Sequence, residues 1–179
     1  RGGPWRQLAP AGVRSIAPPL CALPGERGMR RGIFPRAMSL SIGLVYDLLG
    51  TYPRRPGDPP DVDAEYEPEA TVLLLEAALA TLGHRCIRLG APHALLARIA
   101  KGELPRLDAA MTIAEGWGGR EREAWAPVLL AMAGIPTLGS DATTLSVSLD
   151  KHWTRALVAA AGVPVPEQSV IASATDARA

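Results

Sequence analysis

The sequence contains few cysteines and few aromatic residues, and its charges nearly cancel. Only two of the 179 residues are cysteine, Cys21 and Cys86. They lie far apart in the chain, which excludes a disulfide framework and a CxxC metal site. A reducing, cytoplasmic compartment is therefore the expected location.

Nucleic acid and membranes are not expected as partners of this chain. The formal net charge is +1, and beyond the first stretch the sequence has no basic patches with interleaved aromatic residues. No apolar run reaches the roughly 18 residues of a transmembrane helix. With 47% hydrophobic residues, the composition is that of a globular protein.

Several common cofactor and catalytic motifs are also missing. Gly43 and Gly50 do not form a GxGxxG dinucleotide fingerprint, and the chain has no phosphate-binding P-loop. HExxH and GxSxG are absent, and no Cys/His nucleophile pair is recognisable. The histidines at 84, 93 and 152 are scattered, and we expect them to be surface or cap residues.

Residues 1–37 differ from the rest in composition. They contain seven arginines against one acid, Glu26, and are rich in proline and glycine. Three interpretations are open: a transit peptide, a functional basic arm, or a disordered or non-native segment upstream of a true start at Met38. We favour the last, because organised hydrophobic pattern begins right after Met38.

After Met38, short apolar runs alternate with helical segments. Strands are predicted at residues 41–46, 86–89, 108–114 and 135–138, and the first strand of a further unit at 168–172. Helices are predicted at residues 68–83, 92–102 and 121–133, with one or two more through about residue 161. This order predicts a three-layer α/β fold with a mostly parallel sheet and helices on both faces.

Ligands of such sheets bind at the carboxyl ends of the strands. That rule selects four stretches, which are residues 46–67, the turn after Leu89, residues 115–122 and residues 139–141. The three stretches other than the turn after Leu89 contain glycines and acids, and residues 46–67 and 139–141 also contain hydroxyls, as a polar substrate site requires.

Four segments occur in order at close spacing: AEGWGGRERE at 114–123, GIPTLGSD at 134–141, LDK at 149–151 and GVPVP at 162–166. This set resembles the D-alanine–D-alanine ligase family of the ATP-grasp superfamily, whose members carry a Gly-rich HG–G–DG turn, then GIPYTGS, DK and GIPTP. The resemblance covers residues 41–172. It implies a Rossmann-like pre-ATP-grasp domain at 38–140 and the truncated start of the central ATP-grasp domain at 141–179.

Departures from the family pattern bear on the substrate. The chain has Glu115-Gly116 where the family has His-Gly, and residues 120–123 replace an acid-rich insert. The early Gly-Gly-x-Ser loop is replaced by residues 46–50, and the family's TK pair is Thr154-Arg155. The chain is therefore similar to a ligase-like subgroup whose substrate need not be D-alanine.

The resemblance implies an ATP-dependent carboxylate–amine ligase that acts through an acylphosphate, with a role in peptidoglycan biosynthesis. ATP and Mg²⁺ are the implied cofactors, held mainly by domains outside this chain, so the fragment is expected to be inactive alone. The expected partners are small molecules such as amino acids, and a homodimer is allowed for. Two alternatives stay open: a ligase for a different dipeptide or amide, and a stand-alone α/β binding domain without catalysis.

The resemblance also implies one nucleotide-facing residue. Lys151, one of two lysines in the chain, matches the family's DK lysine, which reaches toward the nucleotide. An ordinary surface lysine is the alternative. Its neighbour Asp150 is expected to cap the following helix. No residue of the chain is expected to bind a metal.

Substrate-side residues are expected in three places. Glu115 either binds a substrate ammonium or caps the next helix, and Gly116 either lets the backbone approach a ligand or simply forms the turn. In the family, a glutamate before the first helix orients the amine of the first amino acid. The candidates in this chain are Glu65, Glu67 and Glu69. Glu67 is preferred among them, and it is also the one candidate for a catalytic role. Ser140 and Asp141 either contact substrate or cap a helix.

Overall fold

The computed structural model describes residues 39–171, and all of these residues belong to one compact unit. The interpretations of residues 1–37, and the start at Met38, lie outside the described residues. A domain boundary at residue 141 also stays a prediction.

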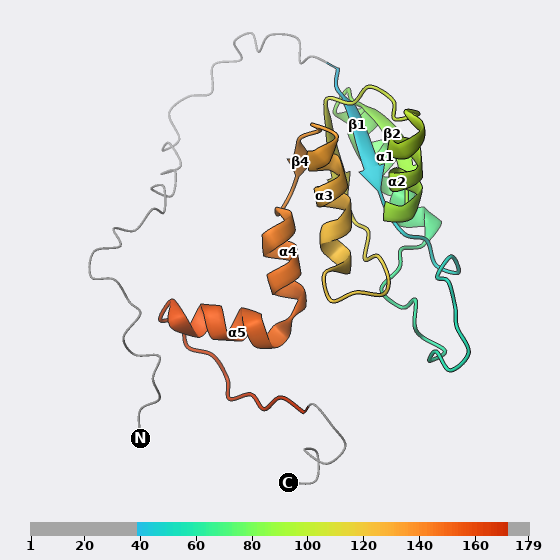
Figure 1. Ribbon diagram of the computed structural model, residues 1–179. Coiled ribbons are helices and arrows are strands. Elements are labelled where there is room, and N and C mark those ends of the chain that lie inside the picture. Colours follow the sequence, from blue (N-terminus) through green and yellow to red (C-terminus); the bar gives the residue numbers. More distant parts are fainter. Residues whose placement is uncertain (1–38, 172–179) are drawn as a thin grey trace, which may run out of the picture. The chain divides into compact units, whose positions relative to one another are not determined.

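The predicted three-layer α/β fold is confirmed. Four parallel strands form one sheet in the order β2-β1-β3-β4, with the first strand of the chain in the interior (Figure 1). The strands are β1 (Ser41–Val45), β2 (Arg85–Gly90), β3 (Ala109–Thr112) and β4 (Thr137–Leu138). Because all four run in the same direction, their carboxyl ends meet at one edge of the sheet.

The helices alternate with these strands along the chain (Figure 1). They are α1 (Glu69–Thr81), α2 (Pro92–Lys101), the 3₁₀ turn η2 (Arg122–Ala124), α3 (Trp125–Met132), α4 (Ala142–Leu149) and α5 (Lys151–Ala160). Among residues 39–171, no helix has both the length and the apolar character that crossing a membrane requires.

Alternate residues of β1 supply two separate cores. Leu44 points to the face covered by α1, where it packs with Val72. Val45 points to the opposite face, where it packs with Leu95 of α2 and Leu130 of α3. Since both faces of the strand are buried, its sequence is continuously apolar rather than alternating.

Gly43 allows β1 to sit this deep between its neighbours. A Cβ at this position would lie 2.7 Å from Cδ1 of Leu89, 2.9 Å from Cδ1 of Leu107 and 3.2 Å from Cβ of Ala110. Two of these contacts are shorter than packed carbon atoms tolerate. Because the two nearest atoms are the ends of leucine side chains, a side chain here would force Leu89 and Leu107 out of their present positions.

Helix ends follow the local sequence signals closely. α2 begins at Pro92 and ends at Gly102, as predicted, and Gly102 has a left-handed φ of 69°. α1 begins at Glu69, because Pro68 is its N-cap rather than its first helical residue. The third helix differs more, since its first turn is the 3₁₀ turn η2 and α3 begins only at Trp125.

The prediction of a strand at residues 168–172 is wrong for the residues that the structure describes. Residues 168–171 have no regular secondary structure. Val170 and Ile171 are 58% and 64% exposed. A strand requires a partner for its backbone hydrogen bonds, and no strand within residues 39–171 pairs with this segment. Ala172 lies outside the described part of the chain.

Candidate substrate site at the carboxyl edge of the sheet

A buried carboxylate, Asp47, organises the edge where β1 ends. Asp47 is 3% exposed, and its Oδ2 accepts a 2.8 Å hydrogen bond from the amide of Gly116. The hydroxyl of Tyr66 donates a 3.1 Å bond to the carbonyl oxygen of the same glycine. Both polar backbone groups of Gly116 are thus held from residues at least 50 positions away.

Burial and hydrogen bonding shift the pKa of the Asp47 carboxyl group in opposite directions. Burial raises the pKa of its carboxyl group, while the backbone amides of Gly116 and Glu115 and the imidazole of His93 oppose that rise.

The acidic segment before α1 is attached to the same strand end. The amide of Glu67 donates to the carbonyl of Asp47 at 3.0 Å, and the amide of Leu49 donates to the carbonyl of Glu67 at 3.0 Å. Leu48 and Glu67 thereby form an isolated parallel bridge. The backbone of Glu67 is part of the scaffold, and a catalytic role for its side chain stays a prediction.

Glu115 stands in a cluster of like charges. Burial raises its pKa to about 7, and the nearby carboxylates of Glu123 and Glu65 add to the rise, whereas Arg122 opposes it. Arg122 also donates to Oε2 of Glu65 at 2.6 Å. The structure therefore brings two predicted substrate residues, Glu65 and Glu115, to one place, together with an arginine and a third glutamate that the sequence interpretation did not include.

A cavity of about 250 Å³ opens between the Gly-rich turn, which is formed by residues 115–120, and the loop before α1. Its lining combines three aromatic rings with an ion pair. The lining residues are Tyr52, Val62, Glu65, Tyr66, Gly116, Trp117, Gly118 and Arg122.

Next to this cavity, four side chains from four segments contact one another in turn. Trp117 lies face to face with His93, with ring centres 4.9 Å apart, and the rings of His93 and Trp125 form a T-shaped pair with centres 5.4 Å apart. The guanidinium of Arg55 lies 5.4 Å from the ring centre of Trp117. His93 is exposed, as predicted, but it also joins α2 to the Gly-rich turn.

Ser140 is placed apart from these groups. It is exposed and lines a different hollow beside α3, with Gly139 and Asp141. Its neighbour Asp141 is the N-cap of α4, accepting a 2.7 Å bond from the amide of Thr144. A substrate role for Ser140 stays a prediction.

Lys151 begins α5 and is exposed, with Nζ donating to the carbonyl of Ser148 at 3.0 Å. Asp150 caps α5 as predicted, because its Oδ1 accepts 3.0 Å bonds from the amides of His152 and Trp153. The other carboxylate oxygen of Asp150 accepts from Arg120 of the Gly-rich turn. The turn and the start of α5 are thereby linked.

The described residues offer cationic groups for a nucleotide but no cluster of ligands for a metal ion. Within residues 39–171, no group of three or more His, Cys, Asp or Glu side chains is arranged to hold a metal ion. Lys151 and Arg155 line one hollow, and each donates one bond to a backbone carbonyl, Arg155 to that of Pro166 at 2.6 Å, which leaves further donors on both side chains. A nucleotide with Mg²⁺ would need further groups.

Comparison with known proteins agrees with a distant ligase relationship. No family model matches the chain. Over 103 residues it is 32% identical to a D-alanine–D-alanine ligase from Stutzerimonas stutzeri (strain A1501). The match covers 58% of this chain but only 31% of the length of that ligase. The chain is thus similar to part of a ligase, in a region that accounts for less than a third of the relative.

Proposed function

We propose that the carboxyl edge of this sheet is the amine-binding wall of an ATP-dependent carboxylate–amine ligase. The observation that carries the proposal is the carboxylate cluster around Arg122, with Glu115 partly buried and flanked by Glu65 and Glu123. A substrate ammonium would relieve the repulsion among these acids and form charge-assisted hydrogen bonds with them. The similarity to a ligase supplies the reaction class.

Within this proposal, residues of the chain bind and orient, and do not activate a carboxylate. Glu115 and Glu65 would hold the ammonium, and Arg122 would keep Glu65 in place. The buried Asp47 and Tyr66 would fix the Gly-rich turn, so that little reorganisation accompanies binding. ATP and Mg²⁺ are proposed for the full-length protein, which would form an amide through an acylphosphate.

A ligase for a different amide is the second candidate, and one observation favours it. The turn that carries Glu115 has an acid where the resembling ligase family has histidine. A carboxylate and an imidazole place different charges next to a bound substrate. A substrate other than D-alanine is therefore the better match for this site.

ADP formation by the full-length protein tests the proposed function. We expect ADP release from ATP and Mg²⁺ that depends on an added amino-acid pair, and none from the 179-residue chain, because we propose that the nucleotide is held mainly by parts of the full-length protein outside this chain. A coupled assay for ADP with pairs drawn from the common amino acids measures both. Release that is independent of amino acids, or turnover by the 179-residue chain, would contradict the proposal.

A further inference from the structure

We infer that the amine substrate carries a large apolar side chain, about the size of an aromatic ring, that occupies a groove between α2 and α3. This inference rests on the proposed amine site and specifies its substrate class. It is carried by the groove itself, which the proposed function does not use.

The groove is apolar and open. α2 packs beside α3, and a hollow of about 200 Å³ lies between their first turns. The hollow is lined by Pro92, His93, Leu96, Trp125, Val128 and Leu129. Leu96 and Val128 are 49% and 42% exposed, although both belong to this lining. Apolar surface of this kind, gathered in one concave place, is typical of a ligand site.

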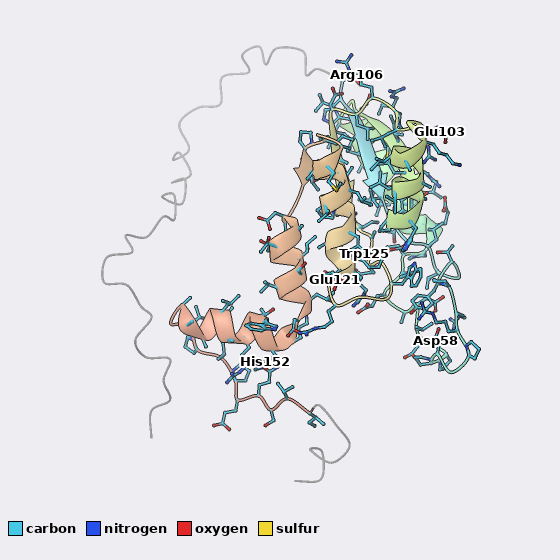
Figure 2. All side chains as sticks on the ribbon, in the orientation of Figure 1. Asp58, Glu103, Arg106, Glu121, Trp125 and His152 are labelled. Carbon is cyan, nitrogen blue, oxygen red and sulfur yellow. The ribbon has the colours of Figure 1, made fainter. Side chains whose placement is uncertain are left out.

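The groove adjoins the Gly-rich turn that carries the proposed amine site. His93 lines the groove and stacks on Trp117 of that turn, with ring centres 4.9 Å apart. On the other side, a Cβ at Gly118 would lie 3.8 Å from Cη2 of Trp125. Figure 2 shows Trp125 where the turn enters α3. The Gly-rich turn therefore borders the groove directly.

The volume of the groove indicates how large the side chain of the amine substrate is. Engineered cavities of about 150 Å³ lined by apolar side chains accommodate benzene, so a groove of about 200 Å³ has room for a phenyl ring or a branched aliphatic chain. The single methyl group of alanine would leave most of it unfilled. Burying a ring there should strengthen binding by about tenfold or more, even though the groove is partly open to solvent.

Two amines with the same charged group test the inference. Ethylamine and phenethylamine differ by the ring alone, and 2-phenylethanol keeps the ring without the charge. By calorimetry on the 179-residue chain at pH 8, we expect phenethylamine to bind at least about tenfold more tightly than ethylamine. Leu96→Asn should reduce that preference to about threefold or less. The matched control is Leu73→Asn, at a leucine of α1 that is 53% exposed and lies outside the groove, and it should leave the preference intact.

The outcomes separate this inference from the proposed function. Equal affinity for both amines, with Glu115→Gln weakening both, would overturn the groove as the side-chain site and leave the amine site standing. A preference that survives Leu96→Asn would also overturn it. If 2-phenylethanol binds as tightly as phenethylamine, the ammonium contributes nothing, so the proposed amine site fails and the inference fails with it. If neither amine binds, the proposed amine site fails and the inference fails with it.

Discussion

Gly116→Ala should destabilise the protein by about 3 kcal/mol, which corresponds to a melting temperature lower by about 10 °C. Gly116 has a φ of 65°, in the left-handed region that disfavours residues with a Cβ. An added Cβ would lie 2.7 Å from the carbonyl oxygen of Arg122 and 3.2 Å from its carbonyl carbon. These are backbone atoms, so no rotamer change relieves the contact, and the turn must shift.

Gly102→Ala is the matched control for this substitution. Gly102 has a φ of 69°, and a Cβ there would have nothing within 4 Å. Its alanine variant carries the left-handed strain alone, about 1 kcal/mol. Thermal unfolding of both variants measures the difference, which reports the clash with Arg122. Equal losses of stability would show that the turn does not pack as described.

Moving the turn should also affect ligand binding. Gly116 is held by its amide bond to the Asp47 carboxylate and by the bond that the Tyr66 hydroxyl donates to its carbonyl, and Glu115 precedes it directly. Gly116→Ala should therefore weaken ethylamine binding at a temperature where the variant is still folded, whereas Gly102→Ala should not. Calorimetry below the melting transition of each variant makes this comparison.

Glu115→Gln should weaken the binding of ethylamine at pH 8 by about tenfold to a hundredfold, because the ammonium loses its charged partner. The same substitution should have little effect on binding at pH 5, where the Glu115 carboxyl group, with its pKa of about 7, is already neutral. Binding isotherms at the two pH values measure this. An equal loss at both would mean that Glu115 does not act through its charge.

Stability should respond to the same substitution in the opposite sense. The pKa of Glu115 is about 7 in the folded chain, above the ordinary value of 4.5. Its favourable contribution is thus fully present below pH 4.5 and is lost as the pH rises through about 7, because the unfolded state releases its proton first. Glu115→Gln should leave the melting temperature nearly unchanged below pH 4.5 and raise it at pH 8.

Glu103→Gln provides the control for both measurements. Glu103 is exposed and lies toward the opposite end of the sheet from Trp125 (Figure 2). Neutralising it removes one negative charge from the chain without changing the carboxylate cluster, and should alter neither binding nor the pH dependence of stability. A response as large as that of Glu115→Gln would assign the effect to net charge.

Features that depend on a few neighbouring residues could be predicted from the sequence. The ends of α2 at Pro92 and Gly102 and the N-caps at Asp141 and Asp150 all follow from backbone geometry within one turn. The parallel sheet follows from the alternation of apolar strands with helices. The strand predicted at residues 168–172 failed because apolar composition cannot supply a neighbouring strand.

The arrangement of the site could be predicted less well, because its contacts join distant residues. The bond between Asp47 and Gly116 spans 69 positions, and that between Arg122 and Glu65 spans 57. The sequence did offer one signal for Asp47, a charged residue that directly continues a buried strand at its carboxyl end. No comparable signal pairs His93 with Trp117, since their stacking depends on how α2 packs against the turn.

The titration of the Glu115 carboxyl group tests the amine site most directly. Carbon-13 NMR of the chain labelled at glutamate carboxyl groups reports each titration, and the resonance missing from Glu115→Gln assigns this residue. The midpoint should lie near pH 7 in the free chain and should fall when ethylamine saturates the site, because a bound ammonium favours the ionised carboxylate. A midpoint near 4.5, or one that saturating ethylamine does not move, would contradict an amine-binding site at this edge of the sheet.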